Sequence, residues 1–193
     1  MLTLVAAACS TPPPKATNAV PAPAEIDQNP VVWAALGGDE TSTAQSDAAQ
    51  ASWTRVVLAE LPASAQLLDV ATADATVEDA LDAQLVALRA SPLPPTVATV
   101  WLGRDEPGTD VGVFADRLTR LVEGLTALGV PRVVLVARSD SPRDRGGQYA
   151  AAIEAVASAT GATYADLRGL PGNPRDPATQ QELAGLLAPY VVG

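Results

Sequence analysis

The sequence predicts an α/β domain, a three-layer α/β/α sandwich around a five-stranded parallel sheet of the flavodoxin-like type. From residue 31 onward, short and nearly continuous apolar segments alternate with longer amphipathic ones. Short apolar runs are typical of strands covered on both faces, and strict alternation with helices implies parallel strands joined by right-handed crossovers. The 193 residues, 48% of them hydrophobic, suffice for one such domain and a tail.

Local signals support the individual elements. Thr76 and Asp79 fit a capping box at the start of one helix, and Gly129 and Gly161 stand where two helices should end. Phe114 opens an apolar stripe with helical spacing. We expect strands at residues 31–36, 66–70, 96–102, 132–137 and 163–167, and helices at residues 43–60, 77–90, 111–128, 148–160 and 177–190.

The N-terminal segment has features of a targeting signal. The first nine residues are apolar and end in Cys9, the only cysteine, and a proline-rich stretch follows. This resembles the end of a bacterial lipoprotein signal, in which the cysteine becomes a lipidated N-terminus. The alternative is an apolar N-terminus with a chance cysteine. Because the basic segment of such a signal is missing, we expect the translation start to lie upstream.

The lipoprotein interpretation divides the chain into a signal remnant at residues 1–8, a lipidated cysteine with an extended tether at 9–29, and a domain at 30–193. It places the protein outside the cytoplasm, anchored through Cys9 to the periplasmic side of the cell membrane. The preference for arginine over lysine, with abundant alanine and valine, is typical of high-GC bacteria such as actinobacteria.

Composition excludes several functions. The net charge of -10 leaves no basic face for nucleic acid. With no histidine in the chain, a Ser-His-Asp triad, a Cys-His dyad and a histidine-bound zinc are all impossible. A single cysteine allows no intrachain disulfide. No cofactor is implied, and the chemistry left to the chain is that of carboxylates, hydroxyls and arginine.

Acidic side chains follow several of the expected strands. Because ligands of parallel α/β sheets bind beyond the carboxyl ends of the strands, these residues should meet at one edge. The candidate site residues are Asp39, Glu40, Asp74, Asp105, Glu106, Asn173 and Asp176.

The same segments resemble the sequence blocks of the SGNH, or GDSL-type, hydrolases. In that family the first strand ends in a Gly-Asp-Ser-x-Thr/Ser block that carries the nucleophile, and the second loop supplies an oxyanion-hole glycine. Residues 36–42 are similar to the first block, with Glu40 where the serine belongs. Residues 73–79 are similar to the second, with Asp74 in place of the glycine.

Two further blocks complete the resemblance, which covers residues 31–190. Residues 103–106 are similar to the family's Gly-x-Asn-Asp block, with Asp105 for the asparagine. Residues 173–177 are similar to its Asp-x-x-His-Pro block, with Asn173 for the aspartate and Asp176 for the histidine. The resemblance therefore implies an SGNH-type fold whose catalytic residues are replaced.

These replacements predict a non-catalytic protein. A glutamate nucleophile would have no imidazole to assist it, and acidic residues around an oxyanion hole would repel the developing charge. We expect an accessory or binding subunit of a membrane-associated assembly, with a membrane or envelope protein as partner. One alternative is an esterase or acetyl-ester hydrolase of envelope lipids or glycans, with Ser42 as a displaced nucleophile. Another is a binding module that holds Ca²⁺ or Mg²⁺ with the rim carboxylates.

Within the non-catalytic interpretation, the acidic residues have several possible roles. They can be a solvated vestige of mutually hydrogen-bonded acids or a contact for a basic residue of a partner protein. The charged loop at 138–147 fits a docking loop or, more simply, a solvated turn. Trp33, Trp53 and Trp101 fit a carbohydrate platform or, more simply, core packing.

Overall fold

The structure, a computed structural model, describes residues 30–42, 52–104, 106, 108–138, 147–170, 173 and 176–193. The signal remnant, Cys9 and the tether lie outside these residues, as do Asp105, the first part of the helix expected at 43–60 and most of the charged loop at 138–147. The predictions made for those segments stay predictions.

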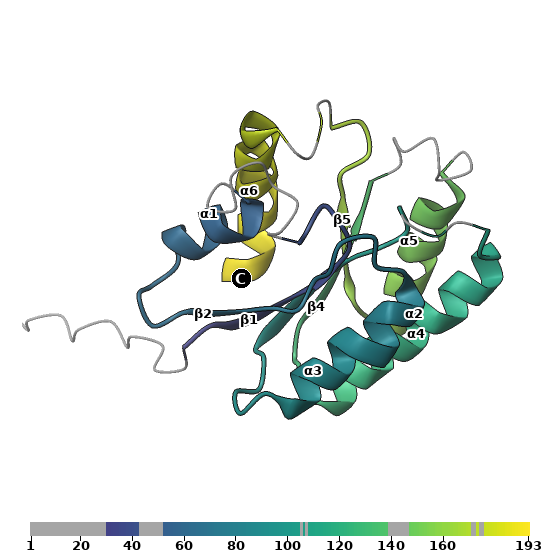
Figure 1. The fold of residues 1–193 in the computed structure, drawn as a ribbon, viewed down its shortest axis with the longest axis horizontal. Coiled ribbons are helices and arrows are strands. Elements are labelled where there is room, and N and C mark those ends of the chain that lie inside the picture. The colour runs from purple at the N-terminus through teal and green to yellow at the C-terminus, as the bar shows by residue number, and fades with distance from the viewer. Residues whose placement is uncertain are drawn as a thin grey trace, which may run out of the picture.

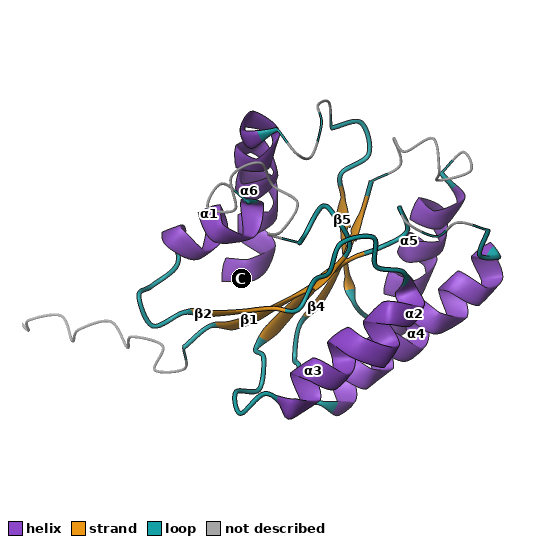
Figure 2. Ribbon diagram, in the orientation of Figure 1, coloured by secondary structure: helices purple, strands orange, loops and turns teal. Residues whose placement is uncertain are grey.

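A five-stranded parallel sheet forms the centre of the domain, with helices on both faces (Figures 1 and 2). The strand order β2-β1-β3-β4-β5 is that of flavodoxin-like folds, as predicted. The strands are β1 (Val32–Gly37), β2 (Gln66–Asp69), β3 (Val97–Trp101), β4 (Val133–Ala137) and β5 (Thr163–Asp166). One face carries α1 (Trp53–Glu60) and α6 (Pro177–Val192); the other carries α2 (Val77–Asp79), η3 (Ala80–Gln84), α3 (Leu85–Ala90), α4 (Val111–Ala127) and α5 (Gln148–Thr160).

Alternation along the strands divides the core in two. In β1, Trp33 and Ala35 pack on the side of α1 and α6, whereas Ala34 and Leu36 pack on the side of α2 to α5. The ring centroids of Trp33 and Trp53 lie 5.3 Å apart. All three tryptophans are almost completely buried, so they fill the core, as expected, and form no carbohydrate platform.

The predicted helix signals are confirmed. Thr76 and Asp79 form the reciprocal bonds of a capping box before α2. Gly129 and Gly161 both have positive φ, near 81° and 76°, directly after α4 and α5. The positive φ ends each helix in a conformation that glycine adopts without strain.

Two details differ from the sequence-based expectation. β2 and β5 are half-exposed because they are the two edges of the sheet, so they are not covered on both faces as expected. The helix expected at 77–90 contains a π-helical turn, η3, between α2 and α3. None of the described helices is both long enough and apolar enough to cross a membrane.

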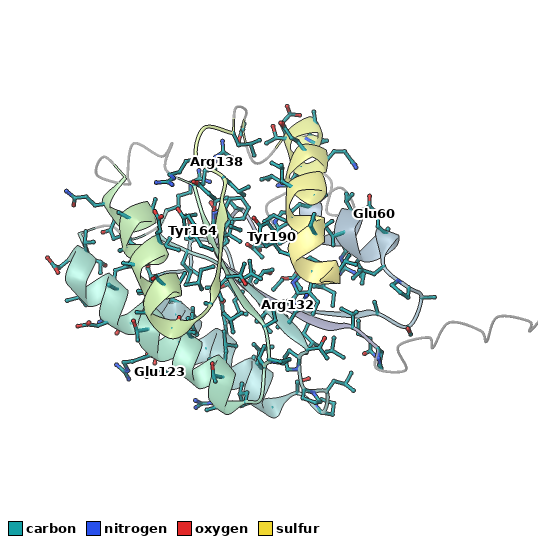
Figure 3. All side chains as sticks on the ribbon, turned by 180° about the vertical axis from the view of Figure 1, so that it is seen from behind. Glu60, Glu123, Arg132, Arg138, Tyr164 and Tyr190 are labelled. Atoms are coloured by element: carbon teal, nitrogen blue, oxygen red, sulfur yellow. The ribbon has the colours of Figure 1, made fainter. Side chains whose placement is uncertain are left out.

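Besides the outer strands β2 and β5, the parallel sheet has one edge at the carboxyl ends of its strands and one at their amino ends, and these two edges differ chemically. Arg132 precedes β4 and Arg138 follows it, so the two side chains mark opposite edges of the sheet (Figure 3). We call the edge at the carboxyl ends of the strands the rim. α6 runs back from the rim and ends at the other edge, where Arg132 donates a hydrogen bond to the Val191 carbonyl.

Candidate functional site

The candidate site lies at the rim between β1 and β3. In this strand order the connections from neighbouring strands diverge there, which opens the crevice where such folds bind ligands. Gly37 at the end of β1 has a φ of 141°, and a β-carbon there would lie 2.2 Å from the Trp101 carbonyl oxygen. Only glycine allows the two strand ends to approach so closely.

A buried glutamine fixes the same point from the helical side. Gln84, the last residue of η3, accepts a hydrogen bond from the Gly37 N–H and donates one to the Gly37 carbonyl, both at 2.9 Å. The side chain thereby satisfies both backbone groups of a strand end that lies in the core. Sequence analysis did not identify Gln84, although a glutamine among apolar helix positions was a visible signal.

Glu40 stands where the resemblance places a nucleophile, and it is held in an ion pair. Its Oε1 lies 2.7 Å from the Arg104 guanidinium, and the two side chains are 5% and 34% exposed, respectively. The Glu40 carbonyl also accepts a hydrogen bond of 2.9 Å from the Trp53 indole. Charge and backbone are therefore both fixed at this position.

Asp39 and Asp74 meet through a backbone hydrogen bond. The Asp74 N–H donates to Asp39 Oδ1 at 2.8 Å. Asp74 has a φ of 55° and is the only non-glycine residue with positive φ among those described. The position thus keeps a glycine-like conformation, but its amide is occupied by a carboxylate and is not offered to an oxyanion.

Glu106 is buried behind the rim. Its Oε1 accepts a short hydrogen bond of 2.6 Å from the Val77 N–H, at the start of α2. Oε2 is buried without a hydrogen-bond partner of normal geometry among the described residues. Burial raises the pKa of the Glu106 carboxyl above its ordinary value, and the bond from Val77 opposes this shift without cancelling it.

The last two predicted residues serve the start of α6. Asp176 is its N-cap, accepting from the Ala178 N–H, and Pro177 follows at the first helical position. The Asp176 N–H donates to the Asn173 carbonyl at 2.8 Å. Both residues are exposed. This connection therefore has a clear structural task, the capping of α6.

Each of the rim carboxylates at Asp39, Glu40, Glu106 and Asp176 is engaged by a partner of its own. In the part of the chain that the structure describes, no group of three or more acidic, histidine or cysteine side chains is placed to hold a metal ion. Asp105, one of the carboxylates expected to contribute, lies outside that part.

The rim thus presents fixed charges. Ser42, the displaced nucleophile of the esterase alternative, is only 5% exposed, and no histidine exists in the chain to act as its base. The residue that sequence analysis missed here is Arg104, because its importance follows from contact with a residue 64 positions away.

The sheet order, the site between β1 and β3, and the chain connectivity define the fold of the SGNH, or GDSL-type, hydrolases, as the sequence blocks implied. A lipolytic protein of the G-D-S-L family from Desulfitobacterium hafniense superposes with a TM-score of 0.70 at 11% identity, over 83% of this chain and 99% of that one.

Two esterases have similar structures. An acetylxylan esterase from Geobacillus stearothermophilus, solved as a catalytic mutant, gives a TM-score of 0.69 at 14% identity, covering 83% of this chain and 94% of that one. A psychrotrophic esterase from Pseudoalteromonas gives 0.65 at 15% identity, covering 84% and 99%. The sequence matches no protein-family model and no curated protein. At these identities the likeness shows the fold.

Proposed function

We propose that this protein is a non-catalytic, SGNH-like lipoprotein of the cell envelope, tethered through Cys9, that binds a membrane or envelope protein as an accessory subunit. The observation that carries the proposal is the Glu40–Arg104 ion pair at the position of a nucleophile, in a chain without histidine. Where the related hydrolases have a nucleophilic serine, this chain has a glutamate whose charge is neutralised by an arginine.

Three observations support a binding role over ester hydrolysis. A nucleophile needs a base, and the chain has no imidazole. An oxyanion needs free N–H donors, and the Asp74 N–H is bound to Asp39. An attacking carboxylate needs to be available to the substrate, and Glu40 is buried against Arg104. A binding role requires none of these.

The rim is the surface we assign to the partner. Asp74 is exposed there, and Asp110 and Asp176 lie exposed in neighbouring connections. Fixed acidic groups on a rigid sheet edge are suited to basic side chains of another protein, because complementary charge speeds association and sets the orientation of binding.

Purification of the tagged, lipidated protein from its native membrane in mild detergent tests this proposal. We expect a stoichiometric membrane or envelope protein to copurify, and the charge reversal Asp74→Lys to remove it. The matched control is Glu123→Lys, which makes the same charge change at an exposed site on α4, away from the rim. Copurification that is absent, or equally sensitive to both reversals, contradicts the assignment.

The competing function is an esterase or acetyl-ester hydrolase. The fold supports it, since several of the similar structures are described as esterases. It would require Ser42 or Glu40 to act without a histidine, and it makes the opposite prediction for ester turnover.

A further inference from the structure

We propose that the domain stands on the membrane with the rim facing away from the bilayer, so that a partner meets the rim from the side distant from the membrane. The inference rests on the lipid anchor of the proposed function and adds an orientation to it. Its basis is the contrast between the two edges of the sheet.

The contrast is first visible in the sequence. The five segments that follow the strands carry ten acidic residues and six arginines, so their net charge is negative. The segments that precede the strands, 30–31, 61–65, 91–96, 128–132 and 161–162, contain a single charged residue, Arg132. We call the edge formed by these segments and the end of α6 the tether pole.

The structure shows what the tether pole exposes. Pro62, Ala63 and Pro131 are exposed on its loops. α6 contains no charged residue after Glu182, and Val192 at its end is 58% exposed. The lone charge, Arg132, is half-buried and bonded to the Val191 carbonyl. The connections of the tether pole therefore carry one charge, and the helix ends beside them add Glu60 and Arg89, which are exposed and opposite in sign.

The tether joins the domain at this same edge. Pro30 is the first described residue, and Val31 accepts a hydrogen bond of 2.8 Å from the N–H of Gln66 at the start of β2. The proposed tether spans residues 9–29, and a proline-rich segment of this length, at about 3.1 Å per residue when extended, is long enough to let the domain turn. Attachment alone therefore does not decide the orientation.

Electrostatic repulsion favours the orientation in which the tether pole, and not the rim, faces the membrane. The protein carries a net charge of -10, and membranes with anionic lipids repel it. Strands of five residues separate the two edges by roughly 17 Å, at about 3.3 Å per residue. This separation is about twice the Debye length of ~8 Å at physiological salt. The tether pole can approach an anionic bilayer with little repulsion, whereas the rim cannot.

Energy transfer to the membrane measures the orientation. Ala63→Cys places a donor dye on the tether pole and Ala178→Cys places one beside the rim; both sites are exposed alanines. The full, lipidated chain carries no other free thiol because Cys9 bears the lipid. The probe membranes are phosphatidylcholine vesicles with or without phosphatidylglycerol, containing an acceptor-labelled lipid.

We expect more transfer from position 63 than from position 178 on anionic vesicles, and a smaller difference on neutral vesicles or at high salt. Adding charge to the tether pole by Ser64→Asp and Pro131→Asp should reduce the difference on anionic vesicles only. Equal or reversed transfer from a vesicle-bound protein overturns the orientation and leaves the anchor intact. A protein that does not float with vesicles overturns the anchor, and the orientation with it.

Discussion

Among single residues, Arg104 has the largest influence on the charge of the site. Arg104→Ala leaves the Glu40 carboxylate buried without its ion-pair partner, and the folded state should lose about 2 kcal/mol. Chemical denaturation measures this loss. Arg120→Ala on the exposed face of α4 is the matched control and should change stability by less than about 0.5 kcal/mol.

The double variant Glu40→Gln/Arg104→Ala tests whether the unpaired charge of Glu40 causes the loss of stability in Arg104→Ala. A neutral amide needs no counter-charge, so the double variant should be more stable than Arg104→Ala alone. If the two variants are equally unstable, packing by the arginine stem, and not charge, holds this part of the rim together.

Glu106 should make stability depend on pH. Its pKa is raised in the folded state, so folding favours the protonated form, and the stability it contributes at low pH is lost as the pH rises through the folded value. Glu106→Gln removes this dependence. The stability of the variant relative to the wild type should therefore increase between about pH 4 and pH 7, as measured by denaturation at both. A relative stability that stays constant, or falls, contradicts the account.

Residue roles at the rim were predictable in part. Glu40 was identified from its place in a Gly-Asp block after a strand, because the local sequence carries that information. Its pairing with Arg104 was not predicted, because the contact depends on how β1 and β3 are aligned, with Gly37 opposite Trp101. Asp176 was assigned to the site, whereas its observed bond caps a helix.

Among the elements, η3 connects the helical layer to the site through Gln84. Gln84→Leu keeps the side-chain volume but leaves the buried Gly37 N–H without its acceptor, whereas the Gly37 carbonyl keeps the hydrogen bond from the Thr72 N–H. A buried donor left without an acceptor costs about 1–3 kcal/mol, so we expect a loss of that size in denaturation experiments. The same substitution at exposed Gln148, at the start of α5, should be nearly neutral. Similar losses at both sites would exclude a specific role for Gln84.

Substitutions of Asp176, the N-cap of α6, can distinguish a structural role of this residue from a role in partner binding. Asp176→Ala removes the N-cap and should lower stability by about 0.5–1 kcal/mol, whereas Asp176→Asn retains a capping oxygen and should lose less. Thermal denaturation measures the stability of both variants. If both variants keep full stability yet lose partner binding, Asp176 belongs to the binding surface and its capping bond is incidental.

Most elements were predictable to within one or two residues, for a physical reason. β4 was expected at 132–137 and lies at Val133–Ala137, because a continuous apolar run in an α/β pattern has few other solutions. The exposure of β2 was not predictable, since its four residues reveal an edge only once the strand order is known. The π-turn was also hidden, because one widened turn barely changes helical periodicity.

At the scale of the whole molecule, an SGNH-type scaffold carries a charged rim at one edge and an almost uncharged tether pole at the other. The rigid sheet fixes the geometry of the rim. Its buried carboxylates, at Asp39, Glu40 and Glu106, are paired or hydrogen-bonded by neighbouring elements, while other acidic groups such as Asp74 stay exposed. This arrangement suits a protein that presents a surface to a partner. At the position of the nucleophile, Glu40 is paired with Arg104, and the Asp74 N–H beside it is bound to Asp39.

Ester turnover by the purified full chain tests the central claim most directly. Hydrolysis of a small aryl acetate is measured for the wild type, Glu40→Ala and Ser42→Ala, beside a buffer blank. We predict that all three proteins match the blank, since the chain offers no histidine as a base for a nucleophile and the Asp74 amide is occupied. Protein-dependent turnover in the wild type that either substitution abolishes would contradict the account and establish a hydrolase.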